Sequence, residues 1–240
     1  MKIRHAVALL VLVTALSPAL RADDFHWQGR VASGATVEVK GVNGGIDAEP
    51  ASGSEAEVTA VKRGRRSNPD EVEIKVIEHS GGVTICAVYP SREGLPNECR
   101  PGSGGRMNTR DNDVNVEFRV RVPAGARFVG RTVNGSIRVE SAGVARGETV
   151  NGSIDAVLGR ADWQGELTLK TVNGAIRVDM PSGLNAEVTA QTVNGDIRTD
   201  FPLTVQGRIS KRRIQGTIGS GGRQLELETV NGGIELRQKS

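Results

Sequence analysis

The chain has 240 residues, with 31 Lys and Arg against 28 Asp and Glu, and a formal net charge of +3. It holds only four Phe, two Trp and one Tyr but 31 Gly, so we expect a core of small aliphatic side chains. Apolar residues recur at regular spacing, which excludes a disordered chain.

Residues 1–22 have the pattern of a secretory signal peptide. A basic start is followed by an apolar run at 6–16, which is too short to span a bilayer. Removing this segment deletes three basic residues and no acidic one, namely Lys2, Arg4 and Arg21. The remaining chain then has 28 basic residues against 28 acidic ones. We therefore expect an exported protein, periplasmic or extracellular in the cell envelope, with no transmembrane span in the mature chain and no nucleic-acid partner.

Residues 23–240 are predicted to form a single domain. Diverged repeats are expected over 30–122 and regular ones over 123–240. Within the diverged part, Glu55–Val61, Glu71–Ile77 and Val83–Tyr89 alternate between apolar and polar residues as strands do.

The two cysteines, Cys86 and Cys99, flank a stretch rich in Pro and Gly. In an exported chain this arrangement predicts a disulfide bond in preference to two free thiols. Such a bond typically contributes about 2–4 kcal/mol. A long loop is expected at 90–112, and the overlapping segment Arg100–Asp113 is predicted to be exposed and structureless. Long loops on rigid scaffolds often carry function, so this loop is a candidate binding region.

One short unit, Thr-Val-Asn-Gly-x-Ile or a close variant, recurs along the chain. Its Asn, or Gln in one degenerate copy, is found at Asn43, Asn134, Asn151, Asn173, Asn194, Gln215 and Asn231. From Asn134 onward the steps are 17, 22, 21, 21 and 16 residues, the size of one coil of a solenoid.

Asn-Gly alone would suggest a hairpin turn. A continuous strand bent at a corner explains the spacing better, because it places Val150, Gly152 and Ile154 on one face. We therefore predict Val and Ile in the interior and a stacked row of Asn side chains with a structural role, facing either inward or outward. No helical period follows the first 22 residues. The expected fold is all-β, a repetitive, parallel β-helix-like solenoid with coils of about 16–22 residues.

The sequence offers no recognisable catalytic, cofactor-binding or metal-ligating set, and none is expected. Only His26 and His79 remain after residue 22. The segment 111–115, Asp-Asn-Asp-Val-Asn, begins like a calcium loop, but Val116 and Val122 stand where that loop needs Gly and Glu. We interpret it as a polar loop. The basic clusters at 62–66 and 211–213 are predicted to be solvated, with contact to anionic lipid or glycan groups as the alternative.

The repeats behind a signal peptide resemble a bacterial family of uncharacterised β-strand-repeat proteins, known as candidate adhesins, with single-stranded β-helix-like folds. The resemblance covers about residues 30–240 and is strongest from residue 132 onward. It implies the fold and a location outside the cytoplasm, and it transfers no catalytic residues.

Two functions follow as hypotheses. The favoured one is a non-catalytic, exported envelope protein that acts in adhesin-like binding or scaffolding, with an unknown envelope protein or glycan as partner. The alternative is a glycan-acting enzyme, of polysaccharide lyase or hydrolase type, on a β-helix scaffold. Against the alternative, aromatic rings for sugar stacking are few, and the repeat acids Asp47, Asp155, Asp179 and Asp196 occupy predicted surface positions.

Overall fold

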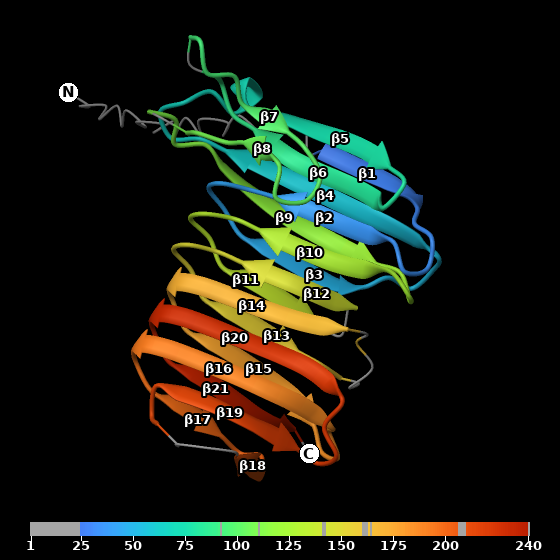
Figure 1. Ribbon diagram of the computed structural model, residues 1–240. Coiled ribbons are helices and arrows are strands. Elements are labelled where there is room, and N and C mark those ends of the chain that lie inside the picture. Colours follow the sequence, from blue (N-terminus) through green and yellow to red (C-terminus); the bar gives the residue numbers. More distant parts are fainter. Residues whose placement is uncertain are drawn as a thin grey trace, which may run out of the picture.

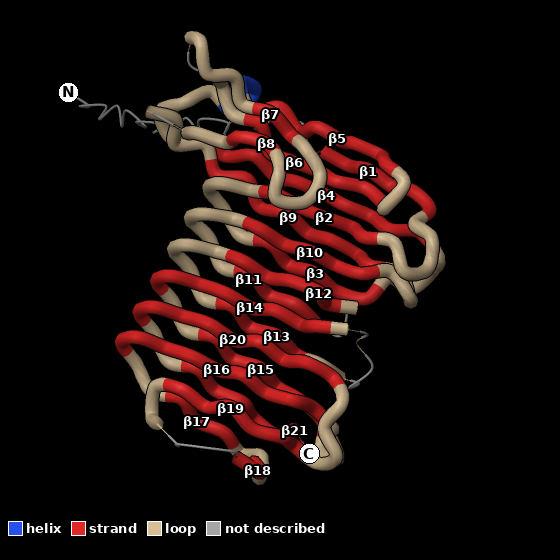
Figure 2. Tube along the Cα trace, viewed as in Figure 1, coloured by secondary structure: helices blue, strands red, loops and turns tan. Residues whose placement is uncertain are grey.

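The computed structural model describes residues 25–239, apart from 92, 110, 141–142, 160–162, 164 and 206–209. The expected signal peptide at 1–22 lies outside the described residues. The chain forms an elongated stack of two long sheets that face each other (Figure 1). Within the described residues the one helical segment is the short 3-10 turn η1 (Pro69–Glu71), and strands account for most of the rest (Figure 2).

The first sheet, sheet A, has nine strands. In spatial order they are β1 (Phe25–Arg30), β4 (Glu55–Arg63), β9 (Asn115–Val122), β3 (Ile46–Pro50), β11 (Ile137–Glu140), β13 (Ile154–Val157), β15 (Ile176–Pro181), β21 (Ile234–Lys239) and β17 (Ile197–Thr199).

The second, sheet B, has ten strands. In spatial order they are β18 (Leu203–Val205), β19 (Arg213–Ile218), β16 (Ala186–Asn194), β20 (Arg223–Asn231), β14 (Glu166–Asn173), β12 (Val144–Glu148), β10 (Arg127–Arg131), β2 (Thr36–Lys40), β6 (Gly82–Val88) and β5 (Glu73–His79). A small third sheet pairs β7 (Glu98–Cys99) with β8 (Gly105–Arg106).

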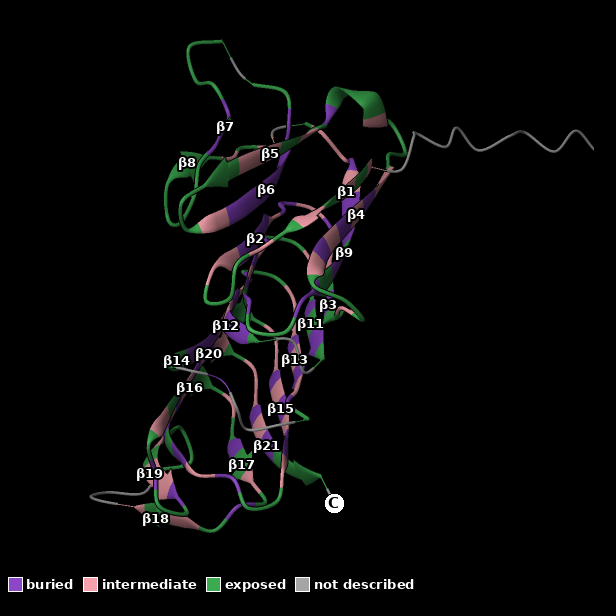
Figure 3. Cartoon of the chain, turned by 90° about the vertical axis from the view of Figure 1, so that its right-hand side faces the viewer, coloured by how far each residue is buried: buried purple, intermediate pink, exposed green. Residues whose placement is uncertain are grey.

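The repeated unit is a rung, which we define as one strand of sheet B, an Asn-Gly corner and the next strand of sheet A. Six rungs stack in parallel, and their isoleucines are in register in sheet A. These isoleucines are buried, and the core between the sheets consists mainly of Val, Ile, Leu and Ala. Buried residues line the space between the two layers (Figure 3).

The rungs do not stack in chain order. Strand β20 lies between β14 and β16, and β21 lies between β15 and β17. The rung of Asn231, the last in the chain, therefore sits between the rungs of Asn173 and Asn194.

The fold is all-β and repetitive as expected, but the sheets are mixed, which corrects the expectation of a parallel β-helix-like stack. Antiparallel pairs are found at three of the four sheet ends. They join β1 with β4 and β4 with β9 at one end of sheet A, β5 with β6 at the same end of sheet B, and β16 with β19 and β19 with β18 at the other end of sheet B. The other end of sheet A is the parallel strand β17. The strands expected near 55–61, 71–77 and 83–89 correspond to β4, β5 and β6.

The expected seventh copy of the repeat, at Gln215, is not a rung. Gln215 lies within β19, which runs antiparallel to β16 and pairs Gln215 with Thr189. The segment stays in one sheet and makes no corner. Its two preceding residues are Arg213 and Ile214 in place of the Thr-Val that precedes most corner Asn residues.

Candidate functional site

Four of the six corners invert the predicted faces of Thr and Val. In these the threonine is buried and the valine points outward: Val133, Val150, Val172 and Val193 are 37%, 38%, 38% and 48% exposed. Val230 is partly buried, and Val42, which follows Gly41 instead of Thr, is in the core as predicted. The prediction that these valines are interior is therefore wrong. Strict alternation fails because the chain bends between two sheets at this point, so only the isoleucine after the bend returns to the core.

Each buried threonine hydroxyl donates a hydrogen bond to a corner glycine carbonyl of the neighbouring rung. The five bonds, 2.8–2.9 Å long, join Thr132 to Gly44, Thr149 to Gly135, Thr171 to Gly152, Thr229 to Gly174 and Thr192 to Gly232. They supply a partner to a backbone oxygen that lies at the bend.

The corner glycine is required by close approach of the backbones. A Cβ atom at Gly152 would lie 2.1 Å from the carbonyl oxygen of Gly135, and one at Gly174 would lie 2.0 Å from that of Gly152. Any side chain would therefore push the rungs apart.

The six corner asparagines form one continuous hydrogen-bonded row on the surface, which we call the Asn ladder. Each Nδ2 donates to the Oδ1 of its neighbour at 2.7–2.9 Å, in the spatial order Asn194, Asn231, Asn173, Asn151, Asn134 and Asn43. At the inner end Asn43 donates to the carbonyls of Asn112 and Val114. The bends between strands of sheet B and sheet A, which carry these asparagines, form a column along the left-hand side of Figure 2.

The exposed valines lie beside this ladder, one residue before each asparagine. We define the Val–Asn edge as the Asn ladder together with Val133, Val150, Val172, Val193 and the partly buried Val230. Among the described residues, Leu95 is the one large exposed apolar residue outside this edge. Exposed apolar side chains gathered in a row are typical of interaction surfaces.

The outer face of sheet A carries a row of alternating charge. Strand register brings into line Arg119, Asp47, Arg138, Asp155, Arg177, Glu235 and Arg198. Arg177 forms ion pairs with Asp155 at 3.3 Å and Glu235 at 3.8 Å.

A second set of charges on this face surrounds Arg121. Its guanidinium contacts Glu49 and Glu57, each at 3.0 Å, and these hydrogen bonds raise the pKa of Arg121. A shallow polar pocket of about 440 Å³ lies here, lined by these three residues with Asp47, Arg119, Arg138 and Glu140 among others.

The outer face of sheet B is also charge-paired. Glu148 accepts from Arg131 at 2.8 Å and from Arg146 at 3.0 Å. Burial raises the pKa of Glu148, but the two arginines outweigh it and hold this pKa below its ordinary value. Further along the sheet, the hydrogen bond from Lys170 to Glu226 raises the pKa of Lys170.

The 90–112 loop is folded onto the outer face of sheet B near β2 and β6 (Figure 1). Cys86 and Cys99 form a disulfide bond, and the β7–β8 hairpin follows. The Lys40 ammonium donates to the carbonyls of Arg100 and Gly102, both at 2.5 Å. Within the stretch expected to be structureless, 100–113, the described residues are loop apart from the two-residue strand β8, and Lys40 fixes the start of this loop.

A buried carboxylate holds the same loop. Glu38 accepts from the backbone N–H of Gly102 at 2.8 Å and from the Thr84 hydroxyl at 2.9 Å, and it pairs with Arg131. Burial lowers the pKa of the nearby Lys40. Alternation alone could not reveal this anchor, because Glu38 occupies an outward position of β2 that the loop then covers.

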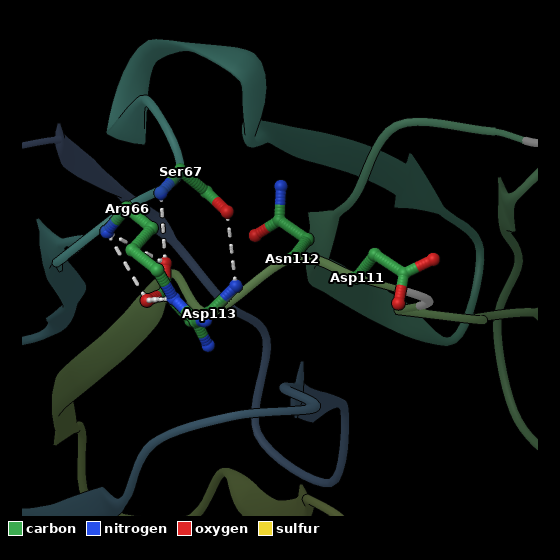
Figure 4. A pocket seen from close by; sticks show the side chains of 5 residues that line it. All are labelled: Arg66, Ser67, Asp111, Asn112 and Asp113. Carbon is green, nitrogen blue, oxygen red and sulfur yellow. Dashed lines mark hydrogen bonds and ion pairs between the residues drawn. The ribbon is translucent and has the colours of Figure 1, made fainter.

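The calcium-like segment serves to join two loops (Figure 4). The Asp113 carboxylate accepts from the backbone N–H groups of Ser67 at 2.9 Å and Arg66 at 3.1 Å, and the Ser67 hydroxyl accepts from the Asp113 N–H. These bonds, that from Ser67 foremost, lower the pKa of Asp113 to about 2. Arg66, Ser67 and Asp113, together with Asp111 and Asn112, line a pocket of about 450 Å³.

The remaining candidate residues have local partners. His26 lies 3.6 Å from Glu57, and His79 contacts the Thr84 hydroxyl at 3.2 Å. In the basic cluster at 62–66, Lys62 donates to the Val72 carbonyl. In the cluster at 211–213, the carbonyls of Lys211 and Arg212 accept hydrogen bonds from backbone N–H groups in the rung of Asn194.

Across the described residues, no group of three or more His, Cys, Asp or Glu side chains is placed to hold a metal ion. The same residues include no helix with the length and apolar character that a membrane crossing needs.

Comparison with known proteins gives a family and a fold. The family model described as Toastrack DUF4097 matches residues 100–237, more than half of the chain. A solved structure from Clostridium sporogenes ATCC 15579, described as a "putative cell adhesion protein", is 14% identical and superposes with a TM-score of 0.60, covering 90% of this chain and 100% of that one. This likeness shows the fold alone.

A second solved structure, described as a "putative adhesin" from Bacteroides fragilis NCTC 9343, is 8% identical with a TM-score of 0.32, over 90% of this chain and 97% of that one. That score is too low to support any conclusion. No protein with a curated description matches the chain in sequence.

Proposed function

The chain belongs to the Toastrack DUF4097 family, and on this premise we propose that it is an exported, non-catalytic protein of the cell envelope. Its β-solenoid acts as an adhesin-like binding or scaffolding surface. The partner is an envelope protein or glycan.

The Val–Asn edge is the observation that carries this proposal. Four of its valines are exposed, three of them at successive corners, whereas the asparagine amides beside them are already bonded within the ladder. The edge therefore offers apolar contact at low desolvation cost, because few unpaired polar groups have to lose water on binding.

Binding is tested with the purified chain and isolated bacterial envelopes. The double variant Val150→Glu with Val172→Glu places two charges on the edge. The matched control, Gln215→Glu with Gln224→Glu, adds the same charge at exposed positions of sheet B. We expect the edge variant to lose binding and the control to keep it. Equal binding by all three proteins would overturn the proposal.

The kind of partner is distinguished by treating the envelopes first. If protease abolishes binding and glycan digestion does not, the partner is a protein, and the reverse result identifies a glycan.

Export is tested separately, by expressing the full chain in a bacterial host and sequencing the N-terminus of the product. The proposal expects a product that starts at Asp23 outside the cytoplasm. A product that keeps Met1 and stays in the cytoplasm contradicts it.

The enzymatic alternative rests on the polar pocket of sheet A. Its acids Glu49 and Glu57 are both engaged by Arg121, so each already has a charged partner. Incubation with acidic polysaccharides, followed by assays for new reducing ends and unsaturated products, decides between the two. Turnover that is lost in an Arg121→Ala variant would overturn the non-catalytic proposal.

A further inference from the structure

The six Asn-Gly corners share a chemical weakness. The backbone nitrogen of the residue after an asparagine can attack the side-chain Cγ, and glycine hinders this least because it has no side chain. All six corners have this sequence, so in an unfolded chain they would be similarly reactive.

In five of the six corners the fold blocks the attack. The glycine N–H donates to the asparagine carbonyl of the adjacent rung at 2.9–3.1 Å; these glycines are Gly44, Gly135, Gly152, Gly174 and Gly232. A bonded N–H is held in place with its proton on the neighbouring carbonyl oxygen, so cyclisation first requires this hydrogen bond to break.

The corner of Asn194 lacks this protection. It is the outermost rung, and among the described residues the N–H of Gly195 has no hydrogen-bond partner. The segment that covers this rung cuts across the corner: the Arg212 carbonyl accepts from the Thr192 N–H and the Lys211 carbonyl from the Ile197 N–H. Gly195 lies between these two contacts.

The Asn194 side chain is also the least constrained of the ladder. Its Nδ2 donates to the Oδ1 of Asn231 at 2.8 Å, but within the described chain its own Oδ1 accepts no bond. The side chain is exposed to water.

We propose that Asn194–Gly195 is a site of spontaneous deamidation and that the other five corners are protected by stacking. The Gly195 nitrogen forms a bond to Cγ of Asn194 and loses its proton, while the Cγ–Nδ2 bond breaks and ammonia leaves. Water then opens the succinimide ring at either carbonyl, which gives aspartate or isoaspartate.

The reaction alters one end of the ladder. A carboxylate at position 194 cannot donate to the Oδ1 of Asn231, so the outermost ladder bond is lost while the inner four remain. The new negative charge lies on the rung that the basic segment 211–213 covers.

The test follows all six corners by peptide mass spectrometry while the folded chain is incubated in mildly alkaline buffer. We expect conversion at Asn194 about tenfold faster than at any other corner, since one hydrogen bond is worth up to about 1.5 kcal/mol and 1.4 kcal/mol is tenfold. In the denatured chain the six rates should be similar. Equal rates in the folded chain, or faster conversion at an inner corner, would overturn the proposal.

Matched variants give an independent measurement. Asn194→Gln should abolish the early release of ammonia from the folded chain, because glutamine cyclises far more slowly. Asn173→Gln, which changes an inner rung, should leave that release unchanged. Undiminished release from Asn194→Gln would contradict the assignment even if both variants are less stable.

Discussion

At the scale of single residues, the threonine of each corner does what a valine could not. It is buried, and its hydroxyl donates to a glycine carbonyl of the next rung. An unpaired carbonyl in this buried position would cost about 1–3 kcal/mol. The threonine is therefore part of the repeat for a structural reason, although alternation alone would place it on the surface.

Neighbouring substitutions test this inversion. Thr171→Val keeps the shape but removes the donor to Gly152, and we expect it to lower the free energy of unfolding by about 1 kcal/mol. Val172→Thr changes an exposed side chain and should stay within about 0.5 kcal/mol. Chemical denaturation of both variants measures this, and a larger loss for Val172→Thr would mean that the faces are assigned wrongly.

Asp113 gives the protein a pH-dependent contact. Its pKa is lowered to about 2 from an ordinary value of 3.8, so the charged carboxylate favours the folded state. This stabilisation is complete above the unfolded-state pKa and is lost as the pH falls through about 2. A nuclear magnetic resonance titration should place the Asp113 midpoint near 2, and Asp113→Asn should flatten the acid limb of the stability profile. A midpoint near the ordinary value would show that the bonds to Ser67 and Arg66 do not form in solution.

At the scale of elements, the order of the rungs makes the charges on the outer face of sheet A alternate, and we expect this alternation to favour that order. The residue after each repeat isoleucine is, in chain order, Asp47, Arg138, Asp155, Arg177, Arg198 and Glu235. Stacking in that order would place Arg177 beside Arg198. The observed insertion of β21 puts Glu235 between them and makes the signs alternate through all six rungs.

Charge reversal at this position tests that explanation. Glu235→Arg places three arginines in a row on β15, β21 and β17, and we expect a loss of about 1 kcal/mol at low ionic strength. The neutral control Glu235→Gln should lose less than half as much. Salt should shrink both effects. A loss that is equal for both variants and insensitive to salt would remove charge as the cause.

The sequence predicts the repeat and its buried isoleucines, but it does not predict the bends or the pairing of strands that are distant in the chain. The period of the repeat and the buried isoleucines follow from the spacing of apolar residues. The bond between Cys86 and Cys99 follows from the expected export, because disulfides form in oxidising compartments. Spacing cannot show the bend that turns Val150 outward, nor the antiparallel pairing of Gln215. The alternation of charge did carry information about rung order, but it becomes readable only when the isoleucines are known to stack in register.

At the scale of the whole molecule, both faces are charge-paired, and antiparallel strands cover both ends of sheet B and one end of sheet A. At the other end of sheet A the parallel strand β17 is the edge. The antiparallel strands limit the exposed parallel edge that would otherwise recruit other chains. The Val–Asn edge is then the surface left with repeated apolar groups. For this reason the proposed binding function depends on the rungs stacking as observed.

Engineered pairs of cysteines test the order of the rungs most directly. Residues 172 and 230 lie on adjacent strands, about 4.8 Å apart at the usual strand spacing, whereas 172 and 193 are separated by a whole rung, about twice that distance. A disulfide needs Cα atoms within about 4.4–6.8 Å. Under mild oxidation Val172→Cys with Val230→Cys should cross-link, and Val172→Cys with Val193→Cys should not. Cross-linking of the second pair in place of the first would contradict the account.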